Sequence, residues 1–203
     1  MSNRPPRKPN SGGRRRGGGA RSGGARGGVT LKRSADGRGW LLSHPAGVRE
    51  RADDLEEVRA MLDAGEIEVA VDELRWLLSG CGEMIEAHFL LGKLAVETDG
   101  DVELGRGHFG FGFQLGERAW RRAGEPHPMP ALHPANRAFF DCGRGLAWCL
   151  RELGKRELAL EVLAKLRAAD PSDPLGLAGW VDELATADTP LVPLATLFTP
   201  RDA

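Results

Sequence analysis

The chain has 203 residues, of which 41% are hydrophobic, and this is enough to build a substantial core. Eleven basic residues and one acidic residue lie in 1–39, which leaves 17 basic and 28 acidic residues in 40–203. The chain is therefore a basic segment followed by an acidic body. No run approaches the roughly 18 to 20 apolar residues of a membrane helix, so we expect no membrane-spanning segment and no membrane partner.

Cysteine usage and the N-terminal residues bear on the cellular compartment. The three cysteines make an odd count without the spacing of a disulfide framework. No basic region is followed by an apolar region of the kind that forms a signal peptide. We therefore expect a reduced, cytoplasmic protein.

Residues 1–39 are predicted to be a disordered tail rich in arginine and glycine. They contain eleven glycines and almost no large apolar side chains, so ordering them would cost entropy with little burial to offset it. Several arginines interleaved with Gly-Gly resemble the arginine-glycine-rich segments of nucleic-acid-binding proteins: Arg14, Arg15, Arg16, Arg21 and Arg26. The tail has no aromatic side chain to stack on bases. Two interpretations stay open, contact with RNA or DNA and a merely solvating segment.

From Trp40 onward the apolar residues take the spacing of helices. Residues 54–64 place apolar side chains three and four positions apart, on one helix face, and Gly65 follows as a stop. A second helix is predicted over 67–79. A third is predicted over 84–98, where Asp99 and Gly100 end it.

The run GRGHFGFGFQLGERAW, residues 105–120, alternates glycine with phenylalanine. A strand would align Phe109, Phe111 and Phe113 on one face, but that pattern covers five residues only. A helix gathers the small and aromatic residues within about 120 degrees of arc: Gly105, Phe109, Gly112, Phe113, Gly116, Ala119, Trp120 and Ala123. The longer match predicts a helix. Since each interior glycine costs about 1 kcal/mol relative to alanine, we expect close helix packing there, with a ligand against the backbone as the alternative.

Residues 138–171 carry the most specific pattern in the chain. Leu146, Ala147 and Leu150 fit a first helix, Gly154 a turn, Ala159 and Leu163 a second helix, and Asp170-Pro171 a terminator. In this arrangement the segment resembles a tetratricopeptide repeat, a helix-turn-helix unit of about 34 residues. The same frame places Ala70 and Gly105, which are 35 residues apart, at the small contact position of two earlier units.

This resemblance implies an all-α fold over 40–186, a tetratricopeptide-like stack of about three helical hairpins with a C-terminal capping helix. The capping helix is predicted over 175–185, with Asp173 as its cap and Pro174 at its first position. Residues 187–203 contain three prolines and are predicted to be an extended tail. Within it, Leu194, Leu197 and Phe198 either dock on the body or belong to a loose terminus.

Patterns that would indicate catalysis or a cofactor are missing from the sequence: it has no HExxH, no CxxC and no GxxxxGK[ST]. Cys142 and Cys149 are seven residues apart, on one helix face, and could hold a metal with His127 or His133. Buried thiols that pack as small apolar groups explain them equally well. We expect no enzymatic activity, no metal and no cofactor. The proline-rich loop 124–136 is either functional or a simple insertion.

The tetratricopeptide resemblance implies a scaffold that holds an unidentified protein or peptide in a concave groove, lined by the first helix of each unit. The implied groove residues are Phe89, Lys93, Val96, Asp141, Arg144, Trp148 and Arg151. The groove positions have no asparagine of the kind with which chaperone-binding members clamp a carboxylate, so chaperone tails are not the expected ligand. The main expectation is a non-catalytic interaction module. The alternative is a nucleic-acid-associated adaptor that uses its tail to bind RNA or DNA.

Overall fold

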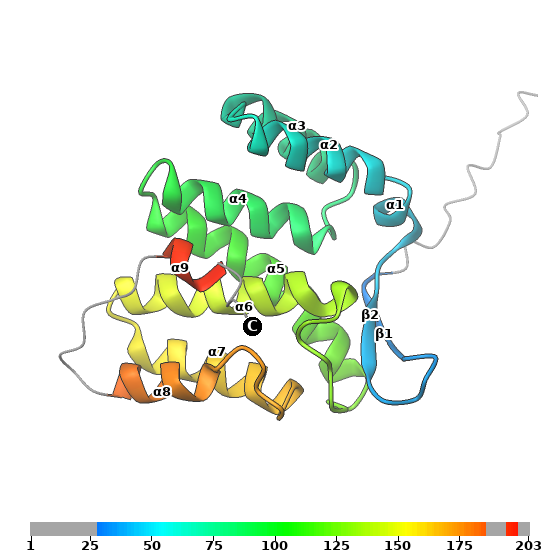
Figure 1. The fold of residues 1–203 in the computed structure, drawn as a ribbon, viewed down its shortest axis with the longest axis vertical. Helices are drawn as coiled ribbons and strands as arrows, with labels where there is room; N and C mark the ends of the chain where they lie inside the picture. The colour runs from blue at the N-terminus through cyan, green and yellow to red at the C-terminus, as the bar shows by residue number, and fades with distance from the viewer. Residues whose placement is uncertain (1–27, 186–193, 199–203) are drawn as a thin grey trace, which may run out of the picture.

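The computed structural model of the chain describes residues 28–185 and 194–198. Two strands come first, and helices make up most of the rest (Figure 1). The elements are β1 (Thr30–Arg33), β2 (Trp40–Ser43), α1 (Ala46–Arg49), α2 (Ala52–Asp63), α3 (Ile67–Gly80), α4 (Ile85–Glu97), α5 (Val102–Arg122), α6 (Pro134–Glu152), α7 (Arg156–Ala169), α8 (Leu177–Ala185) and α9 (Leu194–Phe198). The predicted all-α class is confirmed in that helices make up most of the body, but β2 lies inside the predicted helical domain 40–186 and pairs with β1 before it.

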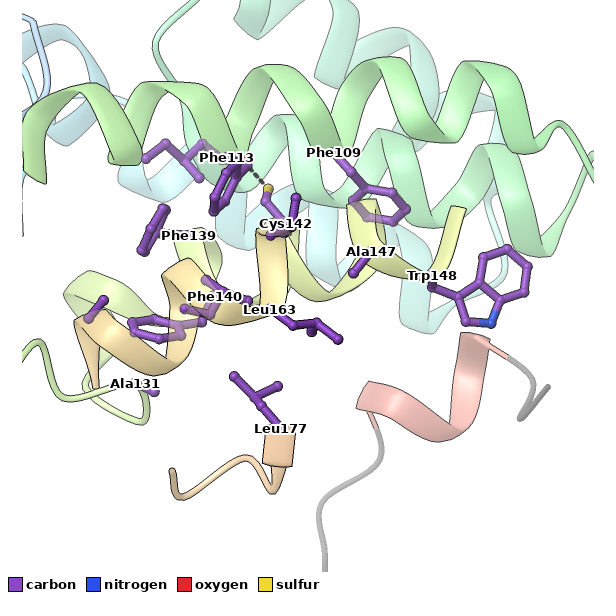
Figure 2. Close-up of a cluster of buried hydrophobic side chains, with 14 of the residues drawn as sticks. Phe109, Phe113, Ala131, Phe139, Phe140, Cys142, Ala147, Trp148, Leu163 and Leu177 are labelled. Carbon is purple, nitrogen blue, oxygen red and sulfur yellow. Dashed lines mark hydrogen bonds between the residues drawn. The ribbon is translucent and has the colours of Figure 1, made fainter. Parts of the chain in front are cut away.

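Helices that follow one another in the chain pack side by side, from α2 and α3 at one end of the stack to α7 and α8 at the other (Figure 1). Helix α4 also contacts α6 directly. A smaller apolar cluster joins α2, α3 and α4, with Val58, Leu74 and Leu77 fully buried in it. The larger cluster joins α5, α6, α7 and α8, with Phe109 and Phe140 fully buried (Figure 2). Helices α4, α5, α6 and α7 therefore each pack against two or more other helices.

The glycine-rich run forms helix α5, as its periodicity predicts, and begins with the Asp101 side chain accepting a hydrogen bond from the Leu104 N–H. A methyl group at Gly112 would lie 2.5 Å from Cys142 Sγ, and one at Gly116 would lie 2.3 Å from Phe139 Cδ2. Methyl groups do not approach other atoms so closely. The glycines therefore let α6 approach α5, which confirms the close-packing interpretation.

Helices α6 and α7 form the hairpin predicted for the last unit. Gly154 stands in the turn with φ of 70°, a conformation that favours glycine over residues with a Cβ. Ala147, Ala159 and Leu163 have no exposed surface, as expected for contact positions. The helices and turn of this unit are confirmed, and its membership of the tetratricopeptide family stays a prediction.

The prediction of disorder over 1–39 is wrong for residues 28–39, and the folded part begins earlier than Trp40. Strands β1 and β2 pair in antiparallel register, with Thr30 opposite Ser43 and Arg33 opposite Trp40. Val29 and Leu42 are 5% and 4% exposed and belong to the larger apolar cluster. Glycine-rich composition masked this short apolar segment. Residues 1–27, including the five arginines singled out above, lie outside the described residues.

Asn136 and the loop before α6 hold the β1–β2 hairpin on the body. The fully buried Asn136 side chain accepts a hydrogen bond from the Leu42 N–H and donates to the carbonyl oxygens of Trp40 and Pro130. The Trp40 N–H also donates to Pro128. The loop is also hydrogen-bonded to the end of α7, where the Ala131 N–H donates to Asp170 Oδ2. These contacts favour an anchoring role for loop 124–136.

Two predictions for the C-terminal part need correction. The capping helix begins at Leu177 and not at Pro174, because Asp173 caps it from four residues away, where its carboxylate accepts from the N–H groups of Leu177 and Ala178. The extended tail predicted over 187–203 contains the helix α9, which packs on α4 and α6. Residues 186–193 and 199–203 lie outside the described residues.

Candidate functional site: the α4/α6 surface

The residues predicted to line a groove lie on α4 and α6, two helices in contact with each other. Phe89, Lys93 and Val96 come from α4; Asp141, Arg144, Trp148 and Arg151 come from α6. Spacings of three and four place each set along one helix face. We call these seven residues the α4/α6 surface. Helix α9 packs against both helices, next to the middle of α6 in the view of Figure 1.

Two side chains of the α4/α6 surface, Phe89 and Arg144, contact the C-terminal turn of α9. The Phe198 ring meets the Phe89 ring edge-on, with centroids 5.0 Å apart. The Arg144 guanidinium lies 5.2 Å from the Phe198 ring centroid and donates a hydrogen bond to the Leu197 carbonyl oxygen. Cations are favourable near the carbonyl end of a helix. Arg144 therefore recognises both an aromatic ring and a backbone end.

Asp141 holds Arg144 in position. Its Oδ1 lies 3.3 Å from Arg144 Nη1, and its Oδ2 lies 2.9 Å from Arg137 Nε. Burial raises the pKa of the Asp141 carboxyl, and the two guanidinium groups oppose this rise. Because Asp141 and Arg144 are both buried, their pairing leaves the guanidinium little freedom to turn away from α9.

The remaining residues of the α4/α6 surface contribute unequally. The Trp148 indole is 8% exposed and lies beside α9 (Figure 2). Lys93 Nζ lies 3.7 Å from Glu97 Oε2, on the same helix. Val96 turns toward α5, since a methyl group at Gly105 would lie 2.4 Å from its Cγ2. Arg151 is partly buried. Phe89, Arg144 and Trp148 thus lie next to α9, whereas Val96 packs against α5.

Helix α9 occupies this surface, and the sequence had left open whether its residues dock on the body. Leu194 is 3% exposed, Leu197 and Phe198 are partly buried against the larger cluster, and Ala195 is exposed. The signal for this helix was the spacing of Leu194, Leu197 and Phe198 at i, i+3 and i+4. That pattern spans a single turn and a half, which is too short to predict a helix by itself.

The cysteines of α6 are packing residues in the structure. Cys142 and Cys149 are fully buried, and Cys142 Sγ lies 3.7 Å from the Ile85 carbonyl oxygen, across the contact with α4. Burial raises the pKa of Cys142 well above its usual value and that of Cys149 to about 12. Both thiols are therefore protonated and unreactive at neutral pH. Within residues 28–185 and 194–198, no group of three or more His, Cys, Asp or Glu side chains could hold a metal ion.

Two neutral histidines join α4 to α5. His88 Nδ1 lies 3.4 Å from His108 Nδ1, and His88 Nε2 lies 3.2 Å from the Gly82 carbonyl oxygen. Burial lowers the pKa of His88 from its usual 6.5 to about 4, and His108 adds to the decrease. Burial and the nearby Arg75 of α3 lower the pKa of His108. Both rings therefore remain uncharged at neutral pH.

Acidification is expected to destabilise the contact between α4 and α5. In the unfolded chain His88 binds a proton near pH 6.5, whereas the folded chain excludes that proton until about pH 4. Unfolding therefore takes up a proton between these values, and the free energy of unfolding falls as the pH drops through this window. Urea unfolding at pH 7 and pH 5 measures the decrease. His88→Gln, which does not titrate, should show a smaller decrease, and an equal decrease would contradict this role of His88.

A hollow of about 520 Å³ between α5 and α7 offers a second place for a ligand, lined in part by Glu117, Trp120 and Lys165. Lys165 Nζ lies 2.6 Å from Glu117 Oε1, and Arg121 Nε lies 3.8 Å from Glu125 Oε1. Its charged groups thus pair with one another. The α4/α6 surface, by contrast, directs Arg144 at a bound segment, and this makes it the better candidate for recognition.

Comparison with protein-family models, with curated proteins and with solved structures found no match to this chain. In the part of the chain that the structure describes, no helix combines the length and the apolar character needed to cross a bilayer. The functional inference therefore comes from the α4/α6 surface itself.

Proposed function

We propose that this protein is a non-catalytic interaction module that binds a short apolar helix of a partner protein on the α4/α6 surface. The observation that carries the proposal is the seating of α9 against Phe89 and Arg144. A surface that holds one short helix through an aromatic contact and a backbone hydrogen bond has the chemistry to hold another of similar pattern.

The contacts of α9 define what the surface recognises. Leu194 supplies a buried apolar anchor and Phe198 a partly buried one, while Ala195 is exposed. Arg144 binds a main-chain carbonyl, which every peptide carries, so its hydrogen bond selects the position of a helix end and not a side chain. Buried aromatic and arginine side chains are also the residues that most often dominate binding energy at interfaces.

The tetratricopeptide resemblance supports the same assignment. In that family the first helix of each unit lines the partner-binding groove, and the resemblance makes α4 and α6 the first helices of the second and third units. The direct contact between α4 and α6 is consistent with this arrangement. The support is independent of α9, because it comes from the repeat pattern in 84–171.

Peptide selection tests the proposed function. A displayed library of helical peptides is selected on the full chain, and the selected peptides are titrated into Phe89→Ala and Arg144→Ala variants. We expect both substitutions to weaken binding by about tenfold or more, as for truncation of an interface anchor. Arg121→Ala, whose side chain is 67% exposed on α5, is the matched control and should bind as the wild type does. Peptides that bind all three variants equally would place recognition elsewhere.

A further inference from the structure

We propose that α9 is a resident ligand of the α4/α6 surface, and that a partner helix must carry the same pattern and displace it. This inference rests on the proposed function and adds two things to it. It names the ligand, a helix with leucine at i and i+3 and phenylalanine at i+4, and it makes access to the surface conditional on the release of α9.

Helix α9 combines one buried core residue, Leu194, with a C-terminal turn that is only partly buried. It touches the body along α4 and α6, and the structure records its polar anchor as the Leu197 carbonyl bound by Arg144. Phe198 contributes its ring to Phe89 and Arg144 and is only partly buried. A five-residue helix gains little stability from its own hydrogen bonds, so it depends on these contacts to exist.

The place of α9 in the chain makes it a competitor. Residues 186–193 join α9 to α8 in the same chain, so α9 meets the surface as an intramolecular competitor. A partner helix binds only the fraction of molecules in which α9 has left, and its apparent affinity is reduced by that fraction. Partners with a low intrinsic affinity or an incomplete pattern therefore do not displace α9.

The surface also selects the chemistry of the partner. Helix α9 has the sequence LATLF and carries no charge. Arg144 is already paired with the buried Asp141, so an acidic side chain on the partner would meet that carboxylate as well. An uncharged helix whose C-terminal turn reaches Arg144 matches this environment, and its aromatic residue fills the position of Phe198 between Phe89 and Arg144.

The test uses the full chain and a fluorescent peptide, LVPLATLFTPR, which corresponds to residues 191–201. The peptide is titrated into the wild type, into Phe198→Ala and into Leu194→Asp, each checked for helix content by circular dichroism. We expect either variant to bind the peptide at least about tenfold more tightly than the wild type, because α9 no longer competes. Ala195→Gln, on the exposed side of α9, should bind as the wild type does. A peptide in which both leucines and the phenylalanine of LATLF are alanine should not bind.

Equal affinity of the wild type and both variants would overturn the inference, and so would the absence of peptide binding to any of them. Adding Arg144→Ala to Phe198→Ala should abolish the gain, and an undiminished gain would count equally against it. These outcomes differ from failure of the proposed function. If selected peptides depend on Phe89 but bind the wild type and Phe198→Ala equally, the interaction module stands and α9 is not its competitor.

Discussion

Asn136→Ala is expected to lower the free energy of unfolding by about 3 kcal/mol, since it leaves the buried Leu42 N–H without its partner, removes two further hydrogen bonds and opens a cavity. The wild-type side chain bonds the Leu42 N–H and the carbonyl oxygens of Trp40 and Pro130, and it has no exposed surface. An alanine satisfies none of these groups and leaves a cavity. The β1–β2 hairpin should therefore separate from the body before the helices unfold.

Hydrogen exchange combined with urea unfolding measures this effect. The Leu42 amide should lose most of its protection in Asn136→Ala, while amides in the middle of α6 keep theirs. Lys32→Ala, at an exposed position of β1, provides the control and should leave both quantities unchanged. Wild-type protection of the Leu42 amide in Asn136→Ala would show that the hairpin is held by other contacts.

Gly116→Val is expected to destabilise the protein by about 3 kcal/mol, at the upper end for an overpacked core. Even a single methyl group at this position would lie 2.3 Å from Phe139 Cδ2. Phe139 cannot move aside easily, because its ring stacks on Phe113 with centroids 5.3 Å apart and meets Phe140 edge-on. Helices α5 and α6 would have to separate to accommodate the added side chain.

A second glycine of α5 gives a control of opposite sign. Gly107 is exposed and has no atom within 4 Å of an added methyl group. Gly107→Ala should therefore raise the free energy of unfolding by about 0.5 to 1 kcal/mol, through the better helix propensity of alanine. Urea unfolding of both variants measures these changes in the free energy of unfolding. If both substitutions stabilise the protein, the glycines of α5 are not there for close packing with α6.

The helices were predictable where their determinants are local. In α5 the period of the small and aromatic residues extends over five turns, so it outweighs the five-residue alternation around Phe111. In α6 and α7, Gly154 and the terminator at Asp170 mark where the chain turns. The assignment of Phe89, Arg144 and Trp148 to a groove came from the tetratricopeptide resemblance, and these residues lie on the faces of α4 and α6 next to α9.

The parts that were not predicted depend on residues far apart in the chain. Leu42 and its anchor Asn136 are separated by 94 positions, and nothing near Leu42 in the sequence identifies that partner. Helix α9 has the same difficulty, because its stability comes from Phe89 and Arg144 more than from its own five residues. The tetratricopeptide resemblance assigned Val96 to the groove, but Gly105 leaves space on the α5 side that Val96 fills.

Photo-crosslinking tests most directly whether the α4/α6 surface holds a short helix. A benzophenone amino acid replaces Phe89 in the full chain, with Arg121 as the exposed control position, and the products are mapped by mass spectrometry. Without peptide, we expect position 89 to crosslink to residues 194–198. With a selected peptide at saturation, the crosslink should move to the peptide. A peptide that is bound but never crosslinks at position 89, while the crosslink to α9 persists undiminished, would contradict the account.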